Sequence, residues 1–114
     1  MSRKIKTQLY EGMYILSSTL SEDARQKALD KITHGITEKG GEIKKVFDQG
    51  RKKLAYEING RREGHYYILF FTAPSMIVSE LWNEYHLNED LIRFLHLTQE
   101  QVPESLDFKP IVQG

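Results

Sequence analysis

The sequence contains no cysteine, which excludes disulfide bonds, a thiol nucleophile and a cysteine-based metal site. It also lacks an apolar run near the ~20 residues that a membrane-spanning helix needs, since its longest run covers only residues 66–71. The N-terminal residues 1–7 are polar and do not have the apolar core of a signal peptide. We therefore expect a soluble cytoplasmic protein of 114 residues, a length typical of one domain.

Net charge is absent as well, because 16 Lys and Arg residues are balanced by 16 Asp and Glu residues. Bulk charge therefore gives no indication of a polyanionic partner. The charges are unevenly placed, however: residues 1–62 carry 14 cations and 8 carboxylates, whereas residues 63–114 carry 2 and 8. This asymmetry predicts one basic surface on an otherwise acidic domain.

The usual sequence signs of an enzyme are missing. The four histidines fall on different predicted elements and do not have the spacing of metal ligands. The Gly40-Gly41 pair follows a predicted helix, whereas a phosphate-binding glycine loop would precede one. We therefore expect no catalytic residue, no metal site and no cofactor.

Hydrophobic periodicity predicts six elements in one domain. Alternating apolar residues predict strands over residues 8–18, 42–58, 65–73 and 91–98, with a bulge near Gly50 and a charged hairpin loop at 59–64. A helix is expected from the N-cap Ser21 to Lys39, and a second one from Pro74. The apolar stripe of the second helix is expected to comprise Ile77, Val78, Leu81, Trp82 and Tyr85.

This element order predicts an α+β fold, a ferredoxin-like βαββαβ sandwich with a four-stranded antiparallel sheet and two helices on one face. The domain is expected to cover residues 1–98. Residues 99–114 contain two prolines and no amphipathic period, so we expect an extended tail there.

The sheet face opposite the helices is the first candidate site. The first and third strands are apolar on both faces, and only one face can pack on the helices. The other face is expected to expose Met13, Ile15, Tyr66, Ile68 and Phe70. Contiguous exposed apolar surface indicates a protein-binding site. The alternative is that the tail folds back over this face.

A basic motif in the second strand is the other candidate site. Gly50 is followed by Arg51, Lys52 and Lys53, and the alternation of apolar residues at 54, 56 and 58 then predicts a half-buried strand. A strand with one buried face would hold its cations in a fixed row that can match a row of phosphates. The alternative is a solvated basic edge that prevents aggregation.

The sequence resembles a known family over residues 8–98. The resemblance is carried, in order, by the segments YEGMYIL (10–16), GRKKLAYEI (50–58), EGHYY (63–67) and LNEDLIRFL (87–95). They are similar to the family of protein six of the bacterial small ribosomal subunit. Glu57 departs from the family pattern, which often has proline there; this difference concerns strand geometry.

The resemblance implies a ferredoxin-like, non-enzymatic protein that pairs with protein eighteen of the same subunit. Together the two proteins would bind a junction in the central domain of the small-subunit rRNA, in the platform. Motif matching implies rRNA contacts by Arg51, Lys52, Lys53, Asn88 and Arg93. Placement near the same edge extends the expected RNA-binding set to Arg3, Lys4 and Tyr10. The apolar face would bind the partner protein.

Two other functions are compatible with this element order. One is a stand-alone binder of single-stranded RNA of the RRM type, whose aromatic third strand is faintly similar to residues 64–71. The other is an enzyme such as an acylphosphatase, which would need a phosphate-binding loop after the first strand. Residues 17–20 contain neither glycine nor arginine, which argues against that enzyme.

Overall fold

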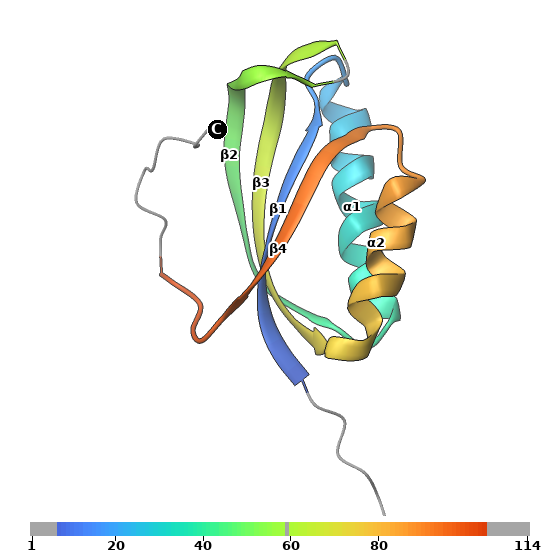
Figure 1. The fold of residues 1–114 in the computed structure, drawn as a ribbon, viewed down its shortest axis with the longest axis vertical. Coiled ribbons are helices and arrows are strands. Elements are labelled where there is room, and N and C mark those ends of the chain that lie inside the picture. The colour runs from blue at the N-terminus through green and yellow to red at the C-terminus, as the bar shows by residue number, and fades with distance from the viewer. Residues whose placement is uncertain (1–6, 59, 105–114) are drawn as a thin grey trace, which may run out of the picture.

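The chain folds as a four-stranded antiparallel sheet with two helices on one face (Figure 1). The computed structural model describes residues 7–58 and 60–104. The elements are β1 (Thr7–Ser17), α1 (Glu22–Glu38), β2 (Glu42–Ile58), β3 (Arg61–Pro74), a 3₁₀ turn (Ser75–Ile77), α2 (Val78–His86) and β4 (Leu91–Gln99). The strand order is β2-β3-β1-β4, so β2 and β4 are edge strands. The predicted ferredoxin-like sandwich is confirmed. No helix within the described residues is long and apolar enough to cross a membrane.

Local sequence signals determine both ends of α1. The Ser21 side chain accepts a hydrogen bond from the backbone N–H of Ala24 at 3.1 Å, which satisfies one of the free donors of the first turn. After the helix, Gly40 adopts a φ of 93° and its N–H donates to the carbonyl of Thr37 at 3.1 Å. A residue with a side chain is strained at this φ, so the glycine permits the abrupt turn into β2.

The core lies between the helices and one face of the sheet. Its largest fully buried side chains are Tyr14, Leu16, Leu69, Phe71, Ile36 and Leu81. The predicted stripe of the second helix is only partly correct. Ile77, Leu81 and Tyr85 are buried, whereas Val78 is half-buried and Trp82 is 42 % exposed. The reason is that the 3₁₀ turn precedes α2, so Ile77 and residues four and eight positions later face the sheet.

A chain of polar side chains links α2, β4 and β1 and runs from the surface at Trp82 into this core at Tyr14. Trp82 Nε1 donates to His96 Nδ1 at 3.2 Å, and His96 Nε2 lies 2.8 Å from the Tyr14 hydroxyl. The Tyr14 hydroxyl is also 2.8 Å from that of Tyr85. Because the indole nitrogen can only donate, Nδ1 of His96 must accept, and a neutral His96 carries its proton on Nε2. Burial lowers the pKa of His96 to about 4, consistent with this neutral state.

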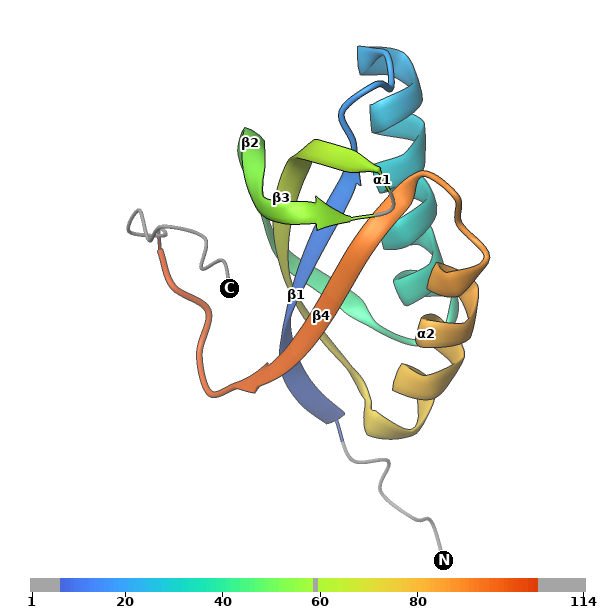
Figure 2. The ribbon, with the colours of Figure 1, turned by 45° about the horizontal axis from the view of Figure 1, so that its top comes forward.

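The ends of β2 and β3 form an arm that curls away from the sheet (Figure 2). We use "the arm" for residues 50–63. Residues 61–64 belong to β3, so the hairpin loop expected over 59–64 is wrong for these four residues. The predicted bulge is confirmed, since the β2–β3 register shifts at Gly50, where φ is 78°. A larger irregularity follows, because residues 54–57 lie between the pairs Lys53–Glu63 and Ile58–Arg61, opposite Arg62 alone. Such excess residues bend a strand.

Candidate nucleic-acid and protein interfaces

The arm concentrates positive charge at one end of the sheet. It carries five cations and two carboxylates, a net charge of +3 in a chain whose total is +0. The cations are Arg51, Lys52, Lys53, Arg61 and Arg62, and the carboxylates are Glu57 and Glu63. Arg51 lies 3.6 Å from Glu63 and Arg62 lies 3.7 Å from Glu57. Exposed ion pairs of this kind contribute at most ~1 kcal/mol, so a phosphate group can compete for either arginine.

The three consecutive cations do not form a single row, which corrects the expectation from the sequence. Arg51 lies opposite His65, Lys52 opposite Gly64 and Lys53 opposite Glu63. Successive side chains of a strand point to opposite faces. Lys52 therefore lies on the other side of the strand from Arg51 and Lys53, and the arm presents cations on both of its sides.

Arg61 fastens the arm to the rest of the domain. Its guanidinium donates to the Ser17 hydroxyl at 2.6 Å and to the Thr19 hydroxyl at 3.3 Å. The Ser17 side chain is buried, so this contact lies at the base of the loop between β1 and α1. Sequence reasoning missed this contact because 44 residues separate Arg61 from Ser17. The hydroxyls of the loop that an acylphosphatase would use for phosphate hold an arginine of the same chain here.

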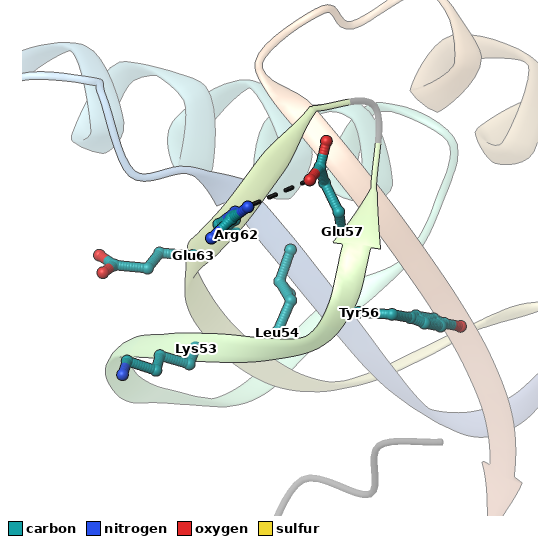
Figure 3. A pocket seen from close by; sticks show the side chains of 6 residues that line it. All are labelled: Lys53, Leu54, Tyr56, Glu57, Arg62 and Glu63. Carbon is teal, nitrogen blue, oxygen red and sulfur yellow. Dashed lines mark ion pairs between the residues drawn. The ribbon is translucent and has the colours of Figure 1, made fainter.

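The bulge in β2 encloses a hollow of about 390 Å³. Its lining residues come from both strands of the arm: Lys53, Leu54, Tyr56, Glu57, Arg62 and Glu63. Figure 3 shows Lys53 and Glu63 extending in one direction and Tyr56 in the opposite one. The Tyr56 ring is 52 % exposed.

Arg93 is the predicted RNA-binding residue that lies near the start of β4. Arg93 is exposed and lies opposite Ile15, which in turn pairs with Tyr66. Burial raises the pKa of Tyr66, and the guanidinium of Arg93 partly offsets this effect. Lys52 is on the same face, next to Gly64, so Lys52 and Arg93 lie on the two edge strands of the sheet.

The remaining predicted RNA-binding residues have different placements. Asn88 shapes the turn before β4, since its side-chain oxygen accepts from the N–H of Asp90 at 3.0 Å. Tyr10 is only 7 % exposed and its ring stacks on Phe71 at 5.6 Å. Its expected RNA contact is therefore wrong, because the ring is a core side chain. Arg3 and Lys4 lie outside the described residues.

The expectation of an uncovered apolar face is also wrong in part. Ile15, Tyr66, Ile68 and Phe70 lie on the face opposite the helices, as predicted, but none is more than 8 % exposed. Phe47 of β2 packs edge-on against Phe70, with ring centroids 5.9 Å apart.

The chain that follows β4 also turns back toward this face (Figure 1). Lys45, which lies opposite Phe70 on β2, donates from its ammonium group to the carbonyl of Glu104 at 2.5 Å. Residues 100–104 thus approach this face at Lys45, the alternative of a tail that covers the face stays a prediction, and the expected course of residues 105–114 lies outside the described residues.

Exposed apolar surface on this face lies instead along β4. Leu95 is 44 % exposed and Leu97 is 50 % exposed, and Leu95 is opposite the half-buried Met13. We call Met13, Leu95 and Leu97 the β4 patch. Sequence reasoning included Met13 but missed the two leucines, although the spacing of two residues between positions 93, 95 and 97 places all three on one face of the strand.

Comparison with known proteins first defines the class. The fold matches the crystal structure of 30S ribosomal protein S6 from Thermotoga maritima with a TM-score of 0.78 and 30% sequence identity, covering 82% of this chain and 89% of that one. The chain therefore has the fold of a small-subunit ribosomal protein.

The family follows from sequence. The model of the family "Ribosomal protein S6" matches residues 9–98, and the chain belongs to this family. It is 61% identical over 111 residues to small ribosomal subunit protein bS6 of Protochlamydia amoebophila, covering 97% of this chain and 96% of the relative. It is 63% identical over 102 residues to that of Chlamydia abortus, covering 90% and 91%. As a member of this family the protein is cytoplasmic and associated with the ribosome.

Proposed function

We propose that this S6-family protein is a non-enzymatic structural component that binds small-subunit rRNA in the platform of the central domain and pairs there with protein eighteen. The anchored basic arm is the observation that carries the proposal. The arm holds a net charge of +3, and Arg61 fastens it to the domain. Cations on an anchored element can neutralise phosphates with little loss of side-chain and backbone entropy on binding.

The rRNA would bind at the end of the sheet where the arm lies. Arg51, Lys52 and Lys53 would contact phosphates, and Arg93 extends the positive charge to the opposite edge of the sheet. Asn88 would act mainly by fixing the turn that precedes Arg93, because its side-chain oxygen is already bonded within that turn.

Protein eighteen would bind the β4 patch. The two exposed leucines lie on an edge strand, where a partner can reach both the side chains and the backbone. The buried residues Ile15, Tyr66, Ile68 and Phe70 would support this surface from within.

The RRM alternative fits the structure less well. A stand-alone RRM stacks bases on aromatic side chains exposed on the sheet. The aromatic residues of β3 on that face are Tyr66 and Phe70, and each is only 2 % exposed.

Charge reversal of the basic motif tests the RNA-binding proposal. The triple substitution Arg51→Glu, Lys52→Glu and Lys53→Glu should reduce incorporation of the protein into small subunits, because phosphate contacts would become repulsive. Co-sedimentation of the tagged protein with small subunits at increasing salt measures this effect. The wild-type association itself should weaken as salt rises.

The matched control replaces three exposed lysines outside the arm with glutamate, and it therefore makes the same change in net charge. These residues are Lys27, Lys31 and Lys44. Circular dichroism and a melting curve establish that both triple variants fold. Incorporation of the arm variant at the level of wild type would show that the arm is merely a solvated edge.

A further inference from the structure

We propose that Tyr56 is a stacking platform for one unpaired nucleotide of the bound RNA, whose neighbouring phosphates along the strand are bound by the cations of the arm. The inference rests on the proposed RNA-binding function and assigns a specific contact to the hollow in the arm. It differs from phosphate binding by the basic motif because stacking involves a base and carries no charge.

The exposure of Tyr56 is the first observation that supports this site. The chain contains six tyrosines, and the other five are at most 7 % exposed. Tyr56 is 52 % exposed, and within the described residues its ring and hydroxyl make no hydrogen bond or ring contact. Core packing therefore does not account for an aromatic residue at this position, whereas an exposed ring face is what a base requires.

The shape of the arm is the second observation. A regular hairpin would pair residues 54–57 of β2 with a partner strand, but here they lie opposite Arg62 alone. The excess residues leave a hollow of about 390 Å³ that Tyr56 lines, and Tyr56 extends to the side opposite Lys53 (Figure 3). The bulge therefore creates space beside an aromatic ring at the rim of a basic hollow.

The charge around the hollow favours a nucleotide over a peptide. Lys53 and Arg62 line it from opposite strands, and the arm as a whole carries a net charge of +3. The carboxylate of Glu57 lies 3.7 Å from Arg62, in an exposed ion pair that a phosphate can displace. An apolar or acidic peptide would satisfy either the ring or the cations, whereas a nucleotide satisfies both.

Arg61 is the positioning residue of this site. Its hydrogen bonds to Ser17 and Thr19 restrain the tip of the arm, and hence the orientation of the bulge. A restrained platform loses little conformational entropy when a base stacks on it.

Substitution of Tyr56 separates stacking from charge. Binding of the full-length protein to small-subunit rRNA in the presence of protein eighteen is measured at several salt concentrations. Tyr56→Ala should weaken binding about 5- to 150-fold, the loss expected for ~1–3 kcal/mol of base stacking. Its salt dependence should stay that of wild type, because no phosphate contact is removed. Tyr56→Phe should bind within about twofold of wild type, since a phenyl ring also stacks.

Two further variants complete the test. Lys53→Gln should lower the slope of log K against log salt by about 0.7–0.9, the value for one lost phosphate contact. Met76→Ala is the control, because Met76 is 71 % exposed and follows the opposite end of β3; it should bind as wild type does.

The possible failures can be told apart. If Tyr56→Ala binds within twofold of wild type while Lys53→Gln lowers the slope, the arm binds RNA but Tyr56 does not stack. A loss in Tyr56→Phe equal to that in Tyr56→Ala would show that the hydroxyl group is what matters, which also overturns stacking. If the wild-type protein shows no binding, the proposed function fails and the inference fails with it.

Discussion

His96 should make the stability of this protein depend on pH below neutrality. Six aromatic rings surround its imidazole, with centroids at 5.5–6.4 Å. Nδ1 accepts from the indole of Trp82. A second proton on the imidazole would have to sit on Nδ1 and would point at the indole N–H. Both burial and geometry therefore oppose the charged form.

The size of the effect follows from the shift in pKa. His96 titrates at about 4 in the folded protein, compared with 6.5 when it is unperturbed. Above pH 6.5 the imidazole is neutral in both states and pH has no effect. Between pH 6.5 and 4 the unfolded chain binds a proton that the folded protein does not bind, so the free energy of unfolding falls with falling pH. A shift of this size corresponds to a loss of about 3 kcal/mol at pH 4, a large share of the ~5–15 kcal/mol that stabilises a typical domain.

Urea denaturation of wild type and His96→Gln between pH 7.5 and 4 measures this contribution. Other acid-sensitive groups act equally in both proteins, so the difference between their unfolding free energies isolates His96. Burial raises the pKa of both Tyr14 and Tyr85, so neither phenol titrates in this range. The stability advantage of wild type should shrink by about 3 kcal/mol as pH falls.

The variant Trp82→Phe provides a matched control. It keeps an aromatic ring against Phe94 but removes the N–H that faces Nδ1, so an NMR titration should find the His96 pKa closer to 6.5 than in wild type. A constant difference between wild type and His96→Gln across the pH range would refute the reasoning.

Two more predictions address the partner surface and the core. Leu95→Asp combined with Leu97→Asp should weaken binding to protein eighteen in a calorimetric titration and leave the fold intact, because both side chains are half-exposed; unchanged affinity would remove the β4 patch from the proposed interface. Gly12→Ala would place a Cβ 2.7 Å from the Tyr14 ring and hydroxyl, so urea denaturation should show a loss of about 1–3 kcal/mol. Wild-type stability of Gly12→Ala would mean that the Tyr14 ring can move without breaking its bonds to His96 and Tyr85.

The features predicted correctly from the sequence depend on local signals. The cap at Ser21, the stop at Gly40 and the bulge at Gly50 each depend on the conformational preferences of one or two residues. Element order and the rule that helices cover one face of such a sheet then lead to the sandwich. Family resemblance reached the same fold independently.

The errors concern contacts between residues far apart in the sequence. Alternation predicted which face of the sheet carries Tyr66, Ile68 and Phe70, but could not show that these residues are buried on that face. The charged segment 61–64 was predicted to be a loop because of its polarity. In the structure it extends β3, since backbone pairing with β2 and the bonds of Arg61 to Ser17 and Thr19 stabilise an extended conformation.

The separation of charge in this chain is consistent with one protein that serves two kinds of partner. A uniformly basic domain would attract RNA over its whole surface and would repel neighbouring basic proteins. Here the cations concentrate on an arm that projects from one end of the sheet, while the exposed leucines lie along an edge strand. Because the arm is anchored through Arg61 and the edge strand through the His96 network, each surface has its own support within the fold. Substitutions in one surface should therefore leave the affinity of the other nearly unchanged, and any strong coupling would have to arise from the RNA or the partner protein.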